Sequence, residues 1–439
     1  MEHKRTAGQF ASSAGFILAA VGSAVGMGNI WLFPYRIGQY GGGAFLVPYF
    51  IFVALFSYVG LSGEFGLGRL TGTGTSGSFD YVLKSGEKKG GSIIGILPLL
   101  GVLGIAIGYS VVVGWVLKYT VGSLTGAVLT NEPQAYFDAM AVDFGSIPWH
   151  LIAVVLTAAV LLMGVKDGIE KISKFMMPAF FILFFIIAIR VAFLPGSWEG
   201  YLYLLTPDWS YLGKFETWVM AMGQAFFSLS LAGSGTIVYG SYLKKDVDVV
   251  SCAKNVAFFD TCAALLAGVV VIPAVFAFGL DVASGPPLMF ISLPAVFQQM
   301  PFGEVFAVIF FVAVLFAALT SLMNLFETPI EALQQQFKLS RKAAVGIVAA
   351  VSAGVGVFIE SGDSVGAWMD AVSIYIIPLG ALLAGIIFYW VCPKGFAREQ
   401  VETGAKKPLG IWFEPVTKYV FVGITLVVYV LGIFFGGIG

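Results

Sequence analysis

Long apolar stretches, separated by short polar segments, run through the whole chain. Eleven of them are close to the roughly 20 residues that an α-helix needs to cross the apolar core of a bilayer. They cover residues 13–37, 42–68, 91–122, 148–165, 175–193, 216–240, 251–280, 302–335, 342–359, 366–391 and 417–437. The pattern therefore predicts an all-α polytopic membrane protein with eleven transmembrane helices, which form a single domain over residues 1–439.

Composition supports this interpretation, because 58% of the residues are hydrophobic and only 11% are charged. A soluble domain carries about 25% charged residues. The net charge of −1 gives no indication of a nucleic-acid partner, and none is expected. The three cysteines lie in or beside apolar stretches without metal-ligand spacing, so neither a disulfide framework nor a metal–thiolate site is predicted. The first apolar stretch is too long for a cleavable signal peptide.

Basic residues are distributed unevenly between the two sides of the predicted membrane. With eleven spans, all but four of the 24 Lys and Arg residues lie on the side of the N-terminus. The exceptions are Arg36, Lys118, Arg190 and Lys214. Because basic residues concentrate in cytoplasmic loops, we expect the N-terminus in the cytoplasm and the C-terminus outside.

The first span contains an unusual segment, Gly22 to Pro34, with three glycines, a serine and Asn29. Glycine costs a helix about 1 kcal/mol relative to alanine, so the helix is expected to open here. Open backbone in a membrane is tolerated only where it lines a polar cavity or is buried in protein. The alternative is that small residues merely let two helices pack closely.

The sixth span is interrupted in a similar way, from Gly223 to Gly235. Spans one and six each begin a block of five spans, about 13–193 and 216–391, and the helix at about 417–437 stands outside both blocks. Since five is odd, the second block enters the membrane from the opposite side. Paired interrupted segments in two such halves indicate a transporter site near the middle of the bilayer.

Several motifs together resemble those of the neurotransmitter:sodium symporter family. They are Gly22 to Pro34, Gly41 to Tyr49, Gln224 to Ser230, Ala317 to Ser321, and Asp370. The resemblance covers essentially the whole chain, and eleven spans are typical of the bacterial subgroup that transports hydrophobic amino acids. It implies a leucine-transporter-like fold with unwound helices 1 and 6. It also implies a sodium-coupled symporter of the bacterial inner (plasma) membrane that imports aliphatic and aromatic L-amino acids by alternating access, not an enzyme.

The resemblance implies two sodium sites. One site, Na2, would use the carbonyl groups of Gly22, Val25 and Ala317 and the hydroxyl groups of Thr320 and Ser321. The other, Na1, would use the Ala24 carbonyl, Asn29, Ser228, Asp260 and the carboxylate of the substrate. Because the substrate would ligate sodium directly, each would raise the affinity for the other. Alternatively, the hydroxyl groups in span eight bond back to their own helix.

The substrate site implied by the resemblance combines the two interrupted spans with spans three and eight. Its residues are Ser23, Ala24, Met27, Gly28, Ile105, Tyr109, Phe227, Ser228, Ser230, Gly233, Ser321 and Leu325. Tyr109 would bond the substrate carboxylate and form a lid with Phe227. A glycine at Gly233, where a leucine-selective relative has phenylalanine, is expected to enlarge the pocket for bulky side chains. Alternatively, Phe227 faces lipid or a neighbouring helix, as most of the 40 phenylalanines do.

The sequence departs from the family pattern at the gates. Leu32 replaces the usual outer arginine, so Arg36 is the expected partner of Asp370. At the cytoplasmic end, Tyr242 matches the expected inner-gate tyrosine, but the usual Arg-x-x-Trp becomes Arg5 with Phe10 at a different spacing. Gln335 stands where the acid that Arg5 would meet is expected, and Glu331 lies one turn away.

Two features of other spans complete the sequence-based picture. The spacing of Gly168 and Pro178 is one that the subgroup uses to unwind helix 5. The alternative is a plain helix start with a proline kink. Glu64 is a carboxylate in span two, which is a costly location. The resemblance implies that it has a structural role and accepts N–H groups freed by the break in span six.

Asp260 replaces an asparagine of chloride-dependent family members. Its carboxylate can supply the negative charge that chloride provides there, so we expect chloride-independent transport. Asp260 is expected to be ionised with sodium bound and to take up a proton when sodium leaves, which would export a proton on the return step. The alternative is that Asp260 is only a permanently charged sodium ligand.

Other function classes remain open from the residues alone. A channel-like or sensor protein on the same scaffold would not concentrate solute, and a symporter could carry another small amine or amino acid. An intramembrane hydrolase using Ser23 lacks a membrane histidine or other base in its segment. Uptake against a gradient discriminates these classes.

Overall fold

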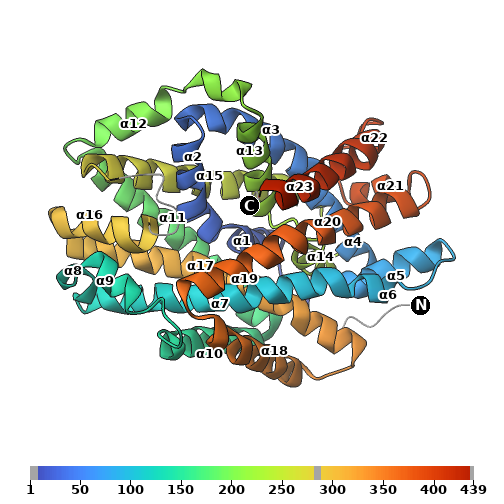
Figure 1. Ribbon diagram of the computed structural model, residues 1–439. Coiled ribbons are helices and arrows are strands. Elements are labelled where there is room, and N and C mark those ends of the chain that lie inside the picture. The colour runs from blue at the N-terminus through green and yellow to red at the C-terminus, as the bar shows by residue number, and fades with distance from the viewer. Residues whose placement is uncertain (1–7, 281–287, 436–439) are drawn as a thin grey trace.

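The computed structural model describes residues 8–280 and 288–435, and all regular structure in these ranges is helical (Figure 1). Each expected span coincides with one helix or with a run of consecutive helices. For the first block these are α1 (Ser13–Ala24) with α2 (Phe33–Gln39), α3 (Leu46–Leu55) with α4 (Ser62–Thr71), α6 (Gly91–Ile94) with α7 (Ile96–Leu124), α10 (Ile147–Leu162) and α11 (Lys171–Ala192). For the remainder they are α13 (Phe215–Ser228) with α14 (Gly235–Ser241), α15 (Val249–Ala277), α17 (Gly303–Gln336), α18 (Arg341–Gly356), α19 (Gly362–Tyr375) with α20 (Ile377–Ile386), and α23 (Val422–Phe435).

Shorter helices form the connections between these spans. They are α5 (Thr75–Ser85), α8 (Ala127–Thr130), α9 (Pro133–Asp138), α12 (Ser197–Leu205), α16 (Leu293–Gln299), α21 (Phe396–Glu402) and α22 (Phe413–Pro415). Wide π-helical turns occur at Gly28–Leu32, Phe56–Leu61, Val165–Glu170, Leu288–Ser292, Ile387–Val391 and Val416–Phe421, and 3-10 turns at Gly42–Phe45, Trp209–Gly213 and Val357–Ile359.

Within the described residues, eight helices are long and apolar enough to cross a membrane, and the bent pair of span one makes a ninth. The fourth and sixth expected spans fall outside this count because α10 has only 16 residues and span six is divided in two. The prediction of an all-α polytopic membrane protein is confirmed. The number of eleven spans stays a prediction.

The first span opens where the glycines predicted. Helix α1 ends at Ala24, Val25 takes an extended conformation, and the following helical segment is bent by 59°. Close packing occurs at the same place, since an added Cβ at Gly22 would lie 2.8 Å from Thr320 Cβ. An added Cβ at Gly28 would lie 2.8 Å from the Phe227 ring. The two interpretations of this segment therefore both hold: the helix opens at the glycines, and the glycines also let neighbouring helices pack closely.

The break in span six separates α13 from α14 by residues 229–234. Ser230 and Gly233 adopt left-handed backbone angles, with φ of 54° and 66°. Glu64 is buried beneath this segment, where its Oε1 accepts the Gly233 N–H at 3.0 Å and its Oε2 accepts the Thr236 hydroxyl. Glu64 thus satisfies backbone that the break leaves unpaired, as the sequence predicted.

The intact helices enclose the broken ones. Helix α17 packs along α7, and α10 and α18 pack against both of them (Figure 1). Helices α11, α15 and α17 surround α1, while α4 packs on α14. The breaks of both interrupted spans therefore lie inside the bundle.

We predict that Glu64→Ala lowers the stability of the purified protein. The change leaves the Gly233 N–H and the Thr236 hydroxyl without their acceptor, at about 1–3 kcal/mol for an unsatisfied buried group. Glu64→Gln should recover part of the loss because its amide oxygen still accepts one bond. Thermal unfolding in detergent measures the difference, and equal midpoints for Glu64→Ala and the wild type would contradict this role.

Candidate functional site

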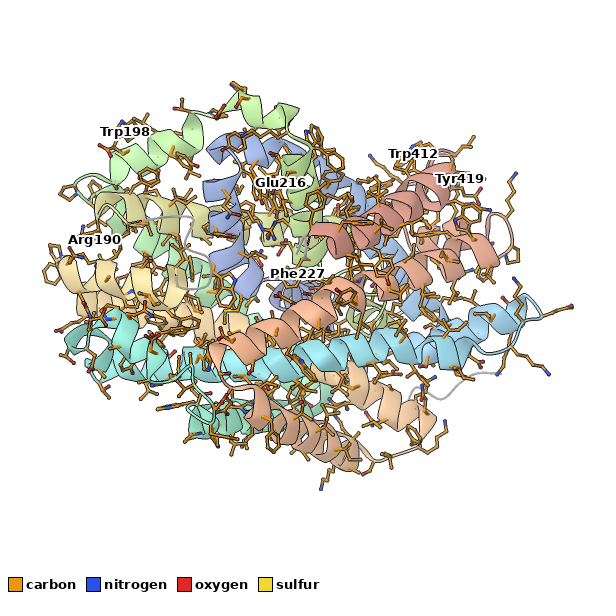
Figure 2. The ribbon with its side chains drawn as sticks, viewed as in Figure 1. Arg190, Trp198, Glu216, Phe227, Trp412 and Tyr419 are labelled. Atoms are coloured by element: carbon orange, nitrogen blue, oxygen red, sulfur yellow. The ribbon has the colours of Figure 1, made fainter. Side chains whose placement is uncertain are left out.

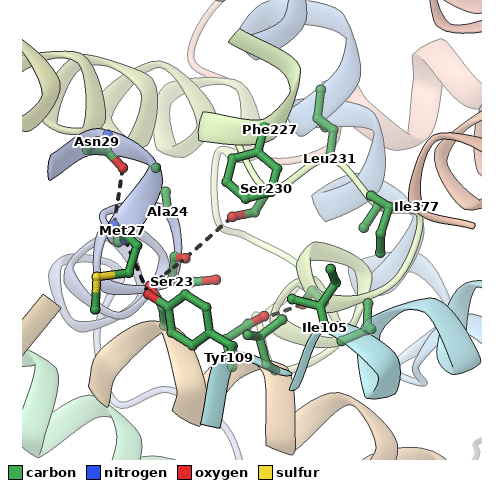
Figure 3. Close-up of a pocket in the computed structure, with 18 residues that line it drawn as sticks. Ser23, Ala24, Met27, Asn29, Ile105, Tyr109, Phe227, Ser230, Leu231 and Ile377 are labelled. Atoms are coloured by element: carbon green, nitrogen blue, oxygen red, sulfur yellow. Dashed lines mark hydrogen bonds between the residues drawn. The ribbon is translucent and has the colours of Figure 1, made fainter. Parts of the chain in front are cut away.

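A cavity of about 100 Å³ lies between the two breaks (Figure 3). Most predicted substrate residues line it: Ser23, Ala24, Met27, Gly28, Ile105, Tyr109, Phe227, Ser230, Ser321 and Leu325. Other lining residues were not predicted, and they include Val102, Leu231, Ala232, Asn324 and Ile377. The cavity thus takes walls from both interrupted spans, from α7 and α17, and from α20.

Phe227 is distinguished from the peripheral aromatic residues by its position. It lies in the interior of the molecule, whereas Trp198, Trp412 and Tyr419 lie at the periphery (Figure 2). Its ring and that of Tyr109 are directed toward the same space (Figure 3). The interpretation of Phe227 as a lipid-facing residue is therefore wrong, while a lid formed with Tyr109 stays a prediction.

The cavity has a polar end and an apolar end. At the polar end, the Tyr109 hydroxyl accepts the Met27 N–H at 3.3 Å, and the Ser230 hydroxyl donates to the Ser23 carbonyl at 3.4 Å. The apolar wall consists of Val102, Ile105, Leu231, Leu325 and Ile377. Such a cavity suits a small molecule with a charged or polar head and an apolar side chain.

Ser228 and Gly233 are not among the residues that line this cavity. An added Cβ at Gly233 would lie 2.2 Å from the Gly380 carbonyl oxygen, so the missing side chain points at backbone. The expectation that Gly233 enlarges the substrate pocket is therefore corrected for this conformation. Its positive φ turns the Cα–Cβ direction away from the cavity, and Leu231 and Ala232 form that wall instead.

The groups predicted for Na2 come together beside the first break. The Ser321 hydroxyl lies 3.2 Å from the Gly22 carbonyl oxygen and 3.0 Å from that of Val25. The Thr320 hydroxyl lies 3.0 Å from the Ala317 carbonyl oxygen, and an added Cβ at Gly22 would be 3.1 Å from it. Thr320 does bond back to its own helix, yet its oxygen still faces the opened segment.

The side chains predicted for Na1 form a second buried cluster. The Asn29 amide donates to Asp260 Oδ1 at 2.8 Å and to the Ser228 hydroxyl at 3.3 Å, and Ser228 donates to Asp260 Oδ2 at 2.5 Å. Ala24 and Asn29 also line the cavity. Asp260 is fully buried, and no Lys, Arg or His pairs with it among the described residues. A buried carboxylate without a cationic partner is costly, so this position suits a bound cation.

Over residues 8–280 and 288–435, no group of three or more His, Cys, Asp or Glu side chains is placed to hold a metal. The oxygens at both clusters come mainly from carbonyl, amide and hydroxyl groups. Carbonyl groups of unwound helices are the ligands that bind sodium in transporters of this architecture.

The predicted outer gate does not form an ion pair in this conformation. Arg36 is buried, and its guanidinium contacts the Met220 sulfur, while Asp370 is exposed. The pairing of these two residues stays a prediction.

At the inner gate, the described residues show a different arrangement from the predicted one. Arg5 lies outside the described residues. Tyr242 donates to Glu327 at 2.6 Å, and Arg341 also binds Glu327, at 2.7 Å. Glu331 accepts the Gly74 N–H at 2.8 Å. Sequence reasoning missed Glu327, although a carboxylate within an apolar span was a signal.

Helix 5 is not unwound between Gly168 and Pro178 in this conformation. Gly168 lies in the π-helical turn Val165–Glu170, and Pro178 lies inside α11. Proline removes one hydrogen bond, and α11 nevertheless continues through it to Ala192. Before the helix starts, Glu170 accepts the Ala11 N–H at 2.6 Å and pairs with Lys174 at 2.6 Å. Unwinding in another conformation stays a prediction.

Comparisons with known proteins agree over nearly the whole chain. The model of the sodium:neurotransmitter symporter family matches residues 7–140 and 134–435. The chain is 39% identical over 324 residues to the sodium-dependent transporter YhdH of Bacillus subtilis. The aligned residues cover 73% of this chain and 71% of the relative. It is 30% identical to a sodium-dependent transporter of Haemophilus influenzae, over 95% of this chain and 96% of the relative. The crystal structure of MhsT in complex with L-phenylalanine superimposes with a TM-score of 0.85 at 31% identity, covering 96% of this chain and 99% of that one.

We predict that Asn29→Ala and Thr320→Ala each weaken sodium binding about tenfold to a hundredfold. A buried hydrogen-bonding group that faces a charge contributes about 1.5–3 kcal/mol. Thr157→Ala is the matched control, because Thr157 is a buried threonine that bonds back to Ala153 away from both clusters. Binding of radioactive sodium to the purified protein measures the effect. Wild-type binding in both variants would remove the assignment of these two residues.

Proposed function

Because this chain belongs to the sodium:neurotransmitter symporter family, we propose that it imports hydrophobic L-amino acids, aliphatic and aromatic, together with sodium. The observation that carries the proposal is the amphipathic cavity between the two helix breaks. Its polar end suits the ammonium and carboxylate groups of an amino acid, and its apolar wall suits a hydrophobic side chain. The match to MhsT, which was crystallised with L-phenylalanine, supports the same substrate class.

Coupling between sodium and substrate follows from a shared wall. Asn29 and Ala24 border the cavity, and Asn29 also contacts Asp260. A substrate carboxylate at the polar end would complete the shell of a sodium ion at Na1, and the ion would neutralise that carboxylate. Each ligand then raises the affinity for the other by the same factor. A second ion at Na2 would hold the opened segment of span one against α17, through Ser321 and Thr320.

Alternating access requires closure on each side of the cavity in turn. On the side of Tyr242, the Tyr242–Glu327–Arg341 cluster ties α14 to α17 and to the start of α18. We propose that this cluster, with Arg5 as a further member, closes the cytoplasmic pathway, and that Arg36 and Asp370 close the external one. Helix 5 would unwind between Gly168 and Pro178 when the inner side opens. The uneven distribution of basic residues supports a cytoplasmic N-terminus in a bacterial inner membrane.

Asp260 supports transport without chloride. Its carboxylate supplies a fixed negative charge next to Ser228 and Asn29. When sodium leaves, the same carboxylate would lack a cation, and protonation would relieve that cost. A proton would then be carried outward on the return step.

Uptake into proteoliposomes tests the transport proposal. We predict that labelled L-phenylalanine and L-leucine accumulate above equilibrium only with an inward sodium gradient, and that other hydrophobic amino acids compete. Tyr109→Phe should raise the half-saturating substrate concentration about tenfold or more, since it removes a bond to a charged group. Tyr419→Phe, at an exposed position, is the matched control. Equilibration without accumulation would indicate a channel, and binding without uptake would indicate a sensor.

We predict that uptake persists when sodium gluconate replaces sodium chloride. Asp260→Asn should make uptake respond to chloride and should weaken its stimulation by an acidic interior, because the neutral side chain no longer supplies the charge or takes up the proton. Initial rates in the two salts, at two internal pH values, measure both effects. Wild-type transport that stops without chloride would refute the role of Asp260 as a substitute for the anion.

A further inference from the structure

A polar cavity of about 570 Å³ lies at the end of the bundle where α4, α5, α6 and α17 meet. Thr73, Ser76, Ser92 and Gln335 line it, and Lys84 and Lys338 stand exposed at its rim. We call it the headgroup cavity. The hydroxyl groups of Thr73 and Ser76 are buried and have no hydrogen-bond partner within the described residues. The cavity therefore offers unused donors deep inside and positive charge at its mouth.

An apolar groove of about 250 Å³ lies next to this cavity, between α7, α17 and α18. We call it the acyl groove, and its lining includes Leu99, Leu103, Leu333 and Val348. Gln336 lines both the groove and the headgroup cavity, so the two adjoin at this side chain.

The order of residues along the helices agrees with a groove that adjoins the headgroup cavity. Ser92 of α6 lines the cavity, and Ile96, one turn further along the chain, lines the groove. On α17, Gln335 lines the cavity, and Leu333 and Ala332, which precede it, line the groove. Figure 1 shows α5 and α6 beside the N-terminal end of α7, with α18 along the outside of the bundle. The composite site therefore begins at a polar end of the bundle and extends along the transmembrane helices.

We propose that this composite site binds one anionic phospholipid of the cytoplasmic leaflet. The phosphate lies between Lys84 and Lys338, the polar headgroup bonds the hydroxyl groups of Thr73 and Ser76, and one acyl chain occupies the acyl groove. The basic residue distribution supports a cytoplasmic location for this end of the bundle, where anionic lipids attract basic pockets between helices. The groove faces outward, since Leu100 and Ile347 on its lining are exposed at the surface of α7 and α18.

One acidic group also lines the headgroup cavity. Asp80 pairs with Lys84 at 2.5 Å, and both side chains are partly exposed. An incoming phosphate would share Lys84 with this carboxylate, so Lys338 supplies the uncompensated charge. The site should therefore prefer an anionic lipid over a zwitterionic one without requiring a high headgroup charge.

Native mass spectrometry of the full-length protein tests the proposal. The protein is released from nanodiscs that contain phosphatidylglycerol and phosphatidylcholine in equal amounts with identical acyl chains. We expect one phosphatidylglycerol molecule to be retained in preference. Lys338→Ala should lower the ratio of the two retained lipids about fivefold, the equivalent of about 1 kcal/mol for one basic residue, and Lys84→Ala should lower it less because Asp80 already pairs with Lys84. The matched control is Lys394→Ala with Lys407→Ala, two exposed lysines from the same predicted side outside the cavity.

Leu100→Trp tests the acyl groove separately. The indole should fill the mouth of the groove and lower retention of phosphatidylglycerol, whereas Leu156→Trp, at an exposed position on α10, should leave it unchanged. Retention is compared on the folded monomer peak of each variant, so that misfolding is not counted as lost binding.

Three results would overturn the proposal. Equal retention of the two lipids by the wild type would exclude headgroup recognition. Displacement by soluble glycerol phosphate, with no effect of Leu100→Trp, would identify a soluble anion site instead. A dimer that Leu100→Trp dissociates would show that a second copy of the chain covers the groove.

Discussion

Backbone that leaves a helix inside a membrane must find other hydrogen-bond partners, and this constraint organises the structure. Each unsatisfied group in hydrocarbon costs several kcal/mol. Span one opens at Val25 and span six opens between Ser228 and Gly235. The Ser321 hydroxyl lies within hydrogen-bond distance of two freed carbonyl groups of span one, and Glu64 accepts the Gly233 N–H of span six. The surrounding intact helices thus carry the residues that make the two breaks possible.

The same constraint explains why the cavity lies next to the two helix breaks. The groups that stabilise the breaks are oxygens and N–H groups directed inward, next to a cavity with an apolar wall. Tyr109 satisfies the Met27 N–H and also borders the cavity, so one side chain serves both purposes. A substrate or ion that enters can exchange bonds with these groups without exposing them to lipid.

The buried carboxylate groups of Glu and Asp residues have different kinds of partners. Glu327 is held by Arg341 and Tyr242, and Glu170 by Lys174, so each has a cation within the protein. Glu64 accepts bonds from the backbone that it supports. Asp260 has only the neutral Asn29 and Ser228 as partners. Asp260 differs from Glu64, which also has only neutral partners, because its neighbour Asn29 borders the cavity, and this is the reason for our proposal of a sodium ion beside it.

The sequence by itself determined the membrane class, the positions of the spans and the two breaks, because hydrophobicity and glycine act locally along the chain. It also singled out Glu64 as a carboxylate in an apolar span, and the family resemblance implied its role as an acceptor for backbone N–H groups. Motif resemblance brought Asn29, Ser228 and Asp260 together, and the structure places them in contact. Only the tertiary structure decided where a side chain at Gly233 would point. That direction depends on the positive φ of Gly233 and on the position of Gly380, which lies on a helix far away in the chain. The tertiary structure also decided that Arg341 pairs with Glu327 and that Gln336 lines both a polar cavity and an apolar groove. Such contacts depend on how helices far apart in the chain pack together, which local sequence patterns do not encode.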